Sequence, residues 1–245
     1  MIRLQKLLAE AGLGSRRTVE AWIREGRVTI GERTARLGDR ALRTDEVRLD
    51  GRKLYLGGEG GAGGELLLYY KPVGEVTTRR DPQGRPTVFE RLPRLRQGRW
   101  ISVGRLDVNT SGLLLLTTDG ELAHRLMHPS GEVEREYLVR VRGRPGPDAI
   151  QRLLAGVLLE DGPAKFDRIS AAPPGNGGHG TFRVVLHEGR NREVRRLWEA
   201  VGFEVSRLLR IRYGPVELPP DMRPGDTRLL GGPTLEGLRR TIRLP

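Results

Sequence analysis

Apolar residues near the start of the chain follow the spacing of two short helices. The first helix has an apolar face with intervals of three and four, formed by Leu4, Leu7, Leu8 and Ala11. Ser15 follows two glycines and can cap a second helix. The buried face of that helix would carry Val19, Trp22 and Ile23. Short apolar runs at 28–30 and 47–49 predict strands, so this part of the chain is expected to form a small α/β domain.

A glycine-rich stretch separates this unit from the rest of the chain. Residues 57–64 read GGEGGAGG, which is typical of a flexible linker because glycine offers no side chain to pack. The expected organisation is a domain at 1–56, a linker at 57–64 and a larger domain at 65–245.

The larger unit mixes strand and helix patterns without strict alternation. Strands are expected at 65–70, 112–117, 136–141, 181–187 and 205–212. Helices are expected between Thr118 and Pro129, at 147–154 and at 191–201. This order predicts an α+β fold, with a mostly antiparallel mixed sheet flanked by helices.

The composition gives the chain a strong positive charge. Its 245 residues include 43 Lys and Arg against 31 Asp and Glu, a formal net charge of +12. Such an excess favours a polyanionic partner, nucleic acid first and an acidic membrane surface second.

There is no cysteine, which excludes disulfides and cysteine-ligated zinc. No apolar run approaches the ~18–20 residues of a membrane span, and no signal peptide is evident, so we expect a cytoplasmic protein that does not use a membrane.

Several arginines lie where a phosphate could neutralise them. Arg16 and Arg17 fall in the first turn of the second helix, where the helix dipole disfavours cations and favours anions. Arg24 lies on the polar side of the same helix. Further RNA contacts are expected from Arg192, Arg196 and Arg210. Taken alone, these positions are equally compatible with ordinary solvated faces.

One aspartate is a candidate for chemistry. Asp107 lies in a loop close to Arg105, and a carboxylate beside a guanidinium stays ionised, which suits a nucleophile or a base. A structural role in the turn is the alternative. His124 and His128 are four apart, but the glutamate of a zinc-protease pattern and a third ligand are lacking nearby. No glycine-rich loop carries the Lys-Ser/Thr pair of a nucleoside-triphosphate site. We therefore expect neither a metal nor a cofactor.

The first fifty residues carry a recognisable pattern. The segment RLQKLLAEAGLGSRRTVEAWIREGRVTIGERTARLG resembles the small RNA-binding domain of ribosomal protein S-four, which also occurs in several RNA-modifying enzymes. The resemblance covers about residues 2–50 and implies binding of structured RNA through the face that bears the paired arginines. It implies no particular reaction.

A longer resemblance covers nearly the whole chain. The segments GRLDVNTSGLLLLTTDGELAHRLMHP, EREYLVRV and EGRNREVRRLWEAVGFEVSRLLRIRYGPVEL resemble the ribosomal RNA pseudouridine synthases of the RsuA/RluB type. The segment EGRNREVRRLWEAVG is most similar to the branch that acts on large-subunit RNA. The resemblance implies isomerisation of a flipped-out uridine to pseudouridine without a cofactor.

The resemblance also implies roles for individual residues. Asp107 would be the catalytic aspartate, and Arg195 the basic residue that pairs with it. Tyr137 would pack on the uracil ring, and Arg105 would assist extrusion of the uridine. Leu208 would line the base pocket. Three actions of the carboxylate are compatible with these residues: attack on the sugar, attack on the ring, or removal of a sugar proton.

Other functions remain open on sequence alone. The chain could be a non-catalytic ribosome assembly factor, a glycosidase that releases the free base, or an enzyme acting on small-subunit RNA. The expected partner is ribosomal RNA, either free or within an assembly intermediate, and the expected oligomeric state is a monomer.

Overall fold

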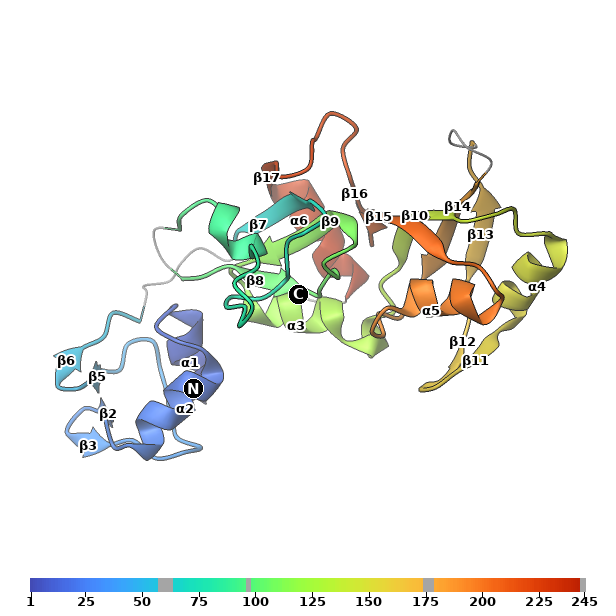
Figure 1. Cartoon of the computed structure of the whole chain (residues 1–245). Coiled ribbons are helices and arrows are strands. Elements are labelled where there is room, and N and C mark those ends of the chain that lie inside the picture. The colour runs from blue at the N-terminus through green and yellow to red at the C-terminus, as the bar shows by residue number, and fades with distance from the viewer. Residues whose placement is uncertain (57–63, 96–97, 174–178, 243–245) are drawn as a thin grey trace. The chain divides into compact units, whose positions relative to one another are not determined.

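The computed structural model describes residues 1–56, 64–95, 98–173 and 179–242. The chain divides into two compact units (Figure 1). The first comprises Met1–Glu65, Pro93–Ile101 and Thr118–Gly120, and the second Leu66–Leu92, Ser102–Thr117 and Glu121–Pro245. Most of the expected linker, residues 57–63, lies outside the described residues. The domain boundaries inferred above therefore remain a prediction.

The first unit contains the two expected helices, α1 (Leu4–Glu10) and α2 (Arg16–Arg24). As predicted, Ser15 caps α2, because its side chain accepts a hydrogen bond of 3.0 Å from the backbone N–H of Thr18. A four-stranded sheet has the order β3-β2-β5-β6. Its strands are β2 (Val28–Ile30), β3 (Arg33–Thr34), β5 (Val47–Leu49) and β6 (Arg52–Lys53). A separate pair is formed by β1 (Ile2–Arg3) and β4 (Arg40–Ala41).

The second unit is built on a large mixed sheet with the order β13-β14-β10-β15-β9-β7-β17. These strands are β7 (Leu66–Lys71), β9 (Ser111–Thr117), β10 (Arg135–Val141), β13 (Arg168–Ala171), β14 (Gly180–Leu186), β15 (Val205–Tyr213) and β17 (Thr227–Leu230). Two short strands pair at its side, β8 (Ile101–Val103) with β9 and β16 (Val216–Glu217) with β15. The pair β9–β15 is parallel, while β7–β9, β10–β15 and β10–β14 are antiparallel. The predicted α+β class with a mostly antiparallel mixed sheet is confirmed.

The remaining elements lie around this sheet. The helices are α3 (Gly120–Met127), α4 (Pro147–Ala155), α5 (Glu193–Ala200) and α6 (Gly232–Thr241), with short 3-10 helices at Val88–Arg91 (η1) and Pro129–Gly131 (η2). A hairpin of β11 (Val157–Leu159) and β12 (Gly162–Ala164) contacts α5. Helix α5 begins two residues later than expected, because Arg192 has a left-handed backbone with φ of 50°.

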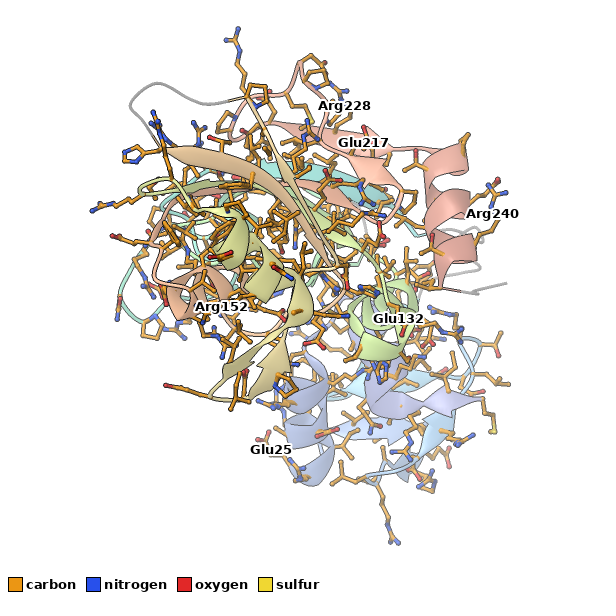
Figure 2. The ribbon with its side chains drawn as sticks, turned by 90° about the vertical axis from the view of Figure 1, so that its right-hand side faces the viewer. Glu25, Glu132, Arg152, Glu217, Arg228 and Arg240 are labelled. Carbon is orange, nitrogen blue, oxygen red and sulfur yellow. The ribbon has the colours of Figure 1, made fainter. Side chains whose placement is uncertain are left out.

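The core of the second unit lies where β7 and β9 pair. Every residue of both strands is buried, as expected for near-continuous apolar runs. Gly112 allows β15 to approach β9, since a Cβ there would lie 2.2 Å from the carbonyl oxygen of Arg210. Arg228 and Arg240 are charged residues with exposed side chains (Figure 2). Within the described ranges, no helix is long and apolar enough to cross a membrane.

Candidate active site

Asp107 lies in a tight turn between β8 and β9. The backbone N–H of Thr110 donates a hydrogen bond of 3.0 Å to the carbonyl of Asp107 and closes this turn. Asp107 is partly exposed. Among the described residues, no ion pair within 4.0 Å and no hydrogen bond ends on its carboxylate. Both carboxylate oxygens are therefore available to a bound molecule.

Four residues on neighbouring strands form a row across the sheet beside this turn. Tyr137 on β10 pairs with Arg210 on β15, which pairs with Gly112 on β9, which pairs with Lys71 on β7. Neighbouring strands are about 4.8 Å apart. Because β15 lies between β10 and β9, the backbone of Tyr137 is two strand spacings away from that of Gly112. Gly112 follows Asp107 by five residues. The row therefore places Tyr137, which is 8% exposed, level with the start of β9, where the Asp107 turn ends.

Arg195 reaches the turn from α5, but it does not contact the carboxylate directly. Its guanidinium donates 2.9 Å hydrogen bonds to the carbonyls of Asn109 and Val205. Burial lowers the pKa of Arg195, and the charge of Arg192 acts in the same direction, whereas the charge of Asp107 acts against them. The expected ion pair is thus absent from the described part of the chain. Arg195 instead holds the turn while lying within electrostatic range of Asp107.

Lys71 is a residue of this site that the sequence analysis missed. Its side chain is completely buried, and its ammonium donates 2.8 Å hydrogen bonds to the carbonyls of Pro72 and Thr110. Burial lowers the pKa of Lys71 to about 8, against the opposing effect of the charges on Glu75 and Asp107. A sequence signal was present, because Lys71 ends the run LLLYYK, in which every other residue is aromatic or aliphatic.

The other residues expected around the base differ in accessibility. Arg105 is exposed and Leu208 is 4% exposed on β15, where its carbonyl accepts a hydrogen bond of 3.4 Å from Ser111 Oγ. Arg210 was expected to contact RNA, but its side chain is buried. It is only 2% exposed, its Nε donates to the carbonyl of Leu113 at 2.7 Å, and its guanidinium lies 5.1 Å from the ring centre of Tyr213. A side chain buried in this way does not reach RNA phosphates.

Two arginines of the expected RNA path differ in their partners. Arg192, at the start of α5, is exposed. Arg196 is half-buried and forms a two-pronged pair with Asp161, with N–O distances of 2.8 and 2.9 Å. Arg196 therefore ties α5 to the β11–β12 hairpin, and a phosphate would have to displace Asp161 to bind it.

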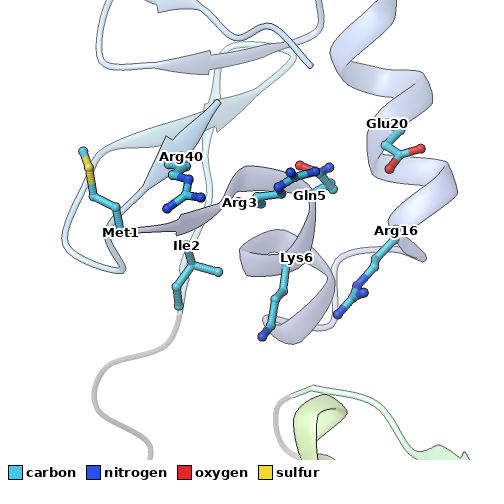
Figure 3. Close-up of a pocket in the computed structure, with 8 residues that line it drawn as sticks. All are labelled: Met1, Ile2, Arg3, Gln5, Lys6, Arg16, Glu20 and Arg40. Atoms are coloured by element: carbon cyan, nitrogen blue, oxygen red, sulfur yellow. The ribbon is translucent and has the colours of Figure 1, made fainter. Parts of the chain in front are cut away.

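In the first unit, the arginines of α2 lie at the surface. Arg16, Arg17 and Arg24 are exposed, and Arg24 lies 3.8 Å from the carboxylate of Glu20. Arg16 also borders a pocket of about 460 Å³ (Figure 3). The lining residues are Met1, Ile2, Arg3, Gln5, Lys6, Arg16, Glu20 and Arg40. Arg3 and Arg40 stand directly opposite each other in the β1–β4 pair, a like-charge arrangement that an anion would relieve.

The histidines do not form a metal site. The rings of His124 and His128 are tilted, with centres 5.7 Å apart. Over the ranges that the structure describes, no three side chains of the His, Asp and Glu types are grouped so that they could hold a metal ion.

Comparison with known proteins gives two family matches. Residues 65–200 match the RNA pseudouridylate synthase family, and residues 2–47 match the S4 domain. A crystal structure described as a pseudouridylate synthase superimposes with a TM-score of 0.66 and 29% identity, covering 97% of this chain and 100% of the other. The first match covers more than half of the chain, and the second confirms the expected N-terminal domain.

Curated relatives agree with these matches. A protein of Pseudomonas aeruginosa named ribosomal large subunit pseudouridine synthase B is 57% identical over 226 residues, covering 92% of this chain and 58% of the relative. A protein of the same name from Escherichia coli K12 is 54% identical over 245 residues, covering 99% of this chain and 84% of the relative. The chain thus spans little more than half the length of the first relative and most of the second. The turn at Asp107, the sheet around it and these matches lead to one conclusion: this chain belongs to the RNA pseudouridylate synthase family.

Proposed function

We propose that this protein isomerises uridine to pseudouridine in ribosomal RNA of the large subunit, with Asp107 as its catalytic carboxylate. In this reaction the bond from ribose C1′ to ring N1 breaks and a bond from C1′ to ring C5 forms. The hydrogen on C5 leaves as a proton and N1 gains one, so the reaction involves no net oxidation or reduction. What is required of the protein is a carboxylate that can reach a single nucleotide and a site that holds the detached ring.

The observation that carries the proposal is the free carboxylate of Asp107 in a turn fixed by two buried cations. Lys71 and Arg195 donate to the carbonyls of Thr110 and Asn109, the residues that complete the turn. Both cations lie within electrostatic range of the Asp107 carboxylate. Because they bond to the backbone, they leave the carboxylate oxygens free for the nucleotide.

Residues around the turn can hold the substrate. A uridine inside a helix cannot reach Asp107, so the base must leave the stack. Tyr137 offers a ring on which the uracil can pack. Leu208 supplies an apolar wall, and the exposed Arg105 can occupy the space that the base leaves. Each of these roles is part of the proposal.

Exposed cations would supply most of the affinity for RNA. In the first unit these are Arg16, Arg17 and Arg24, together with Arg3 and Arg40 of the neighbouring pocket. In the second unit Arg192 is exposed, whereas Arg210 is buried and does not belong to this set. Phosphate contacts of this kind set affinity and its salt dependence, while the shape of the RNA selects the uridine. We further propose that the protein is a monomer, which light scattering of the purified protein tests. We also propose that it acts in the cytoplasm.

Replacing Asp107 with Asn tests the proposed chemistry. The change keeps the shape of the side chain but removes its charge, so the rate should fall at least about 10²-fold with little loss of RNA affinity. Pseudouridine mapping of large-subunit RNA, with tritium release from uridine labelled at C5, measures the activity. Asp148→Asn, an exposed aspartate at the start of α4, is the matched control and should behave as wild type.

The outcomes separate the alternatives. Equal modification by Asp107→Asn and wild type would exclude the proposed mechanism. No modification by the wild-type protein, together with tight RNA binding, would favour an assembly factor. Release of free uracil would identify a glycosidase, and modification confined to small-subunit RNA would change the substrate.

A further inference from the structure

The segment that follows β7 contacts the chain on both sides of Asp107. The hydroxyl of Thr77 donates a hydrogen bond of 2.9 Å to the carbonyl of Leu106 and accepts one of 3.2 Å from the N–H of Leu106. The backbone N–H of Gly74 donates a hydrogen bond of 2.8 Å to the carbonyl of Val108. One segment therefore fixes the residue before Asp107 and the residue after it.

These contacts matter because Asp107 has no partner of its own. In the described chain its carboxylate is not held by any hydrogen bond, so its direction depends on the backbone from which it projects. The turn does not lie in a strand, and no sheet ladder fixes Leu106. A hydroxyl is both donor and acceptor, so Thr77 satisfies both backbone groups of Leu106 with one side chain.

The bracing segment is itself firmly anchored. Glu75 is 3% exposed and accepts a hydrogen bond of 2.6 Å from the hydroxyl of Tyr69, while Arg91 lies 3.2 Å from its other oxygen. The backbone N–H of Val76 donates to the carbonyl of Pro86 at 2.9 Å. A rigid neighbour transmits position, whereas a mobile loop would not.

We propose that Thr77 is a positioning residue that aims the carboxylate of Asp107 at the nucleotide through Leu106. This inference rests on the proposed role of Asp107. Thr77 does not touch the substrate in this scheme. Its loss should therefore lower kcat and leave KM and RNA affinity nearly unchanged, because a shift of the carboxylate affects the reacting atoms and not the bound RNA.

Thr77→Val is the direct test. Valine has nearly the same shape but no hydroxyl, so both backbone groups of Leu106, which is 5% exposed, lose their partner. We expect kcat, measured as tritium release from C5-labelled uridine in RNA, to fall about 10- to 100-fold. KM and the Kd for RNA should change less than about 3-fold. Thr77→Ser keeps the hydroxyl and should retain kcat within about 3-fold of wild type.

Thr78→Val is the matched control. Thr78 is the next residue, and its hydroxyl donates to the carbonyl of Arg80 at 3.0 Å and not to the Asp107 turn. The same chemical change there should leave kcat at the wild-type value. Thermal melting of all variants shows whether each is folded at the assay temperature.

The results distinguish this inference from the proposed function. Wild-type kcat in Thr77→Val, or a Thr77→Ser variant as slow as Thr77→Val, would overturn the brace even if Asp107→Asn is inactive. A rise in KM with unchanged kcat would overturn it as well, because that places Thr77 in RNA binding. Wild-type activity in Asp107→Asn would overturn the proposed function. The inference about Thr77 would then fail with it, because Thr77 is proposed to position Asp107. If Thr77→Val does not fold, the Thr77→Ser result alone still decides, since the inference requires near-normal kcat in that variant.

Discussion

The cations of interest are exposed in the first unit of this protein and buried in the second. On α2 of the first unit, Arg16 and Arg17 are exposed at a helix start where the dipole repels them. Around the Asp107 turn, Lys71 and Arg195 are buried and bonded to backbone carbonyls. An exposed cation remains free to meet a phosphate, whereas a buried one fixes the chain that surrounds it. The same residue type therefore indicates binding in one region and positioning in the other.

The largest effect expected from this contrast concerns Lys71. Its pKa is lowered from 10.5 to about 8, so the unfolded chain holds a proton that the folded protein releases between these values. Stability should therefore rise with pH across this window, by about 3 kcal/mol for such a shift. Urea unfolding at several pH values, compared with Lys71→Met, measures the difference. The variant should lack this contribution, and identical pH dependence in both proteins would contradict a buried charged lysine.

Arg195 should give the next largest effect. Arg195→Met removes the donor to Asn109 and the nearby charge, which should lower kcat about 10²-fold with little change in RNA affinity. Arg196→Met is the control on the same helix, because Arg196 pairs with the partly exposed Asp161. Steady-state kinetics and filter binding separate the two quantities. If Arg195→Met instead weakens RNA binding and spares kcat, the division between binding and positioning cations fails.

The exposed arginines should give the smallest effect. Arg16→Ala combined with Arg17→Ala should weaken RNA binding about 10-fold and reduce the slope of log Kd against log salt by about 0.7–0.9 per lost phosphate contact. The value of kcat at saturating RNA should not change. Arg27→Ala is the control, because Arg27 is already paired with Asp50 at 2.6 Å. An unchanged salt slope in the double variant would show that α2 does not meet phosphate.

The arginines of β15 show where sequence reasoning reaches its limit. A period of two would place alternate residues of this strand on one face. The pairing of β10 with β15 has register shifts at Glu136/Tyr137 and at Arg140/Val141, so burial does not follow that period. Arg207 and Arg210 are three residues apart with no register shift between them, so they lie on opposite faces, and Arg207 is exposed whereas Arg210 is 2% exposed. Which face of the strand is covered depends on what packs against the sheet, so local sequence could not predict which arginine is exposed.

Some features of this protein are determined locally and could be read from the chain. The spacing of apolar residues predicted α1 and α2, and local residue types predicted the serine cap and the buried strand at 112–117, because each depends on residues a few positions apart. The long motif around Asp107 identified the family and the candidate acid. Tertiary structure alone decided that Lys71 and Arg195 hold the turn and that Thr77 braces it. These contacts join segments up to 86 residues apart, and they exist only once the strands have paired and the water around them has been excluded.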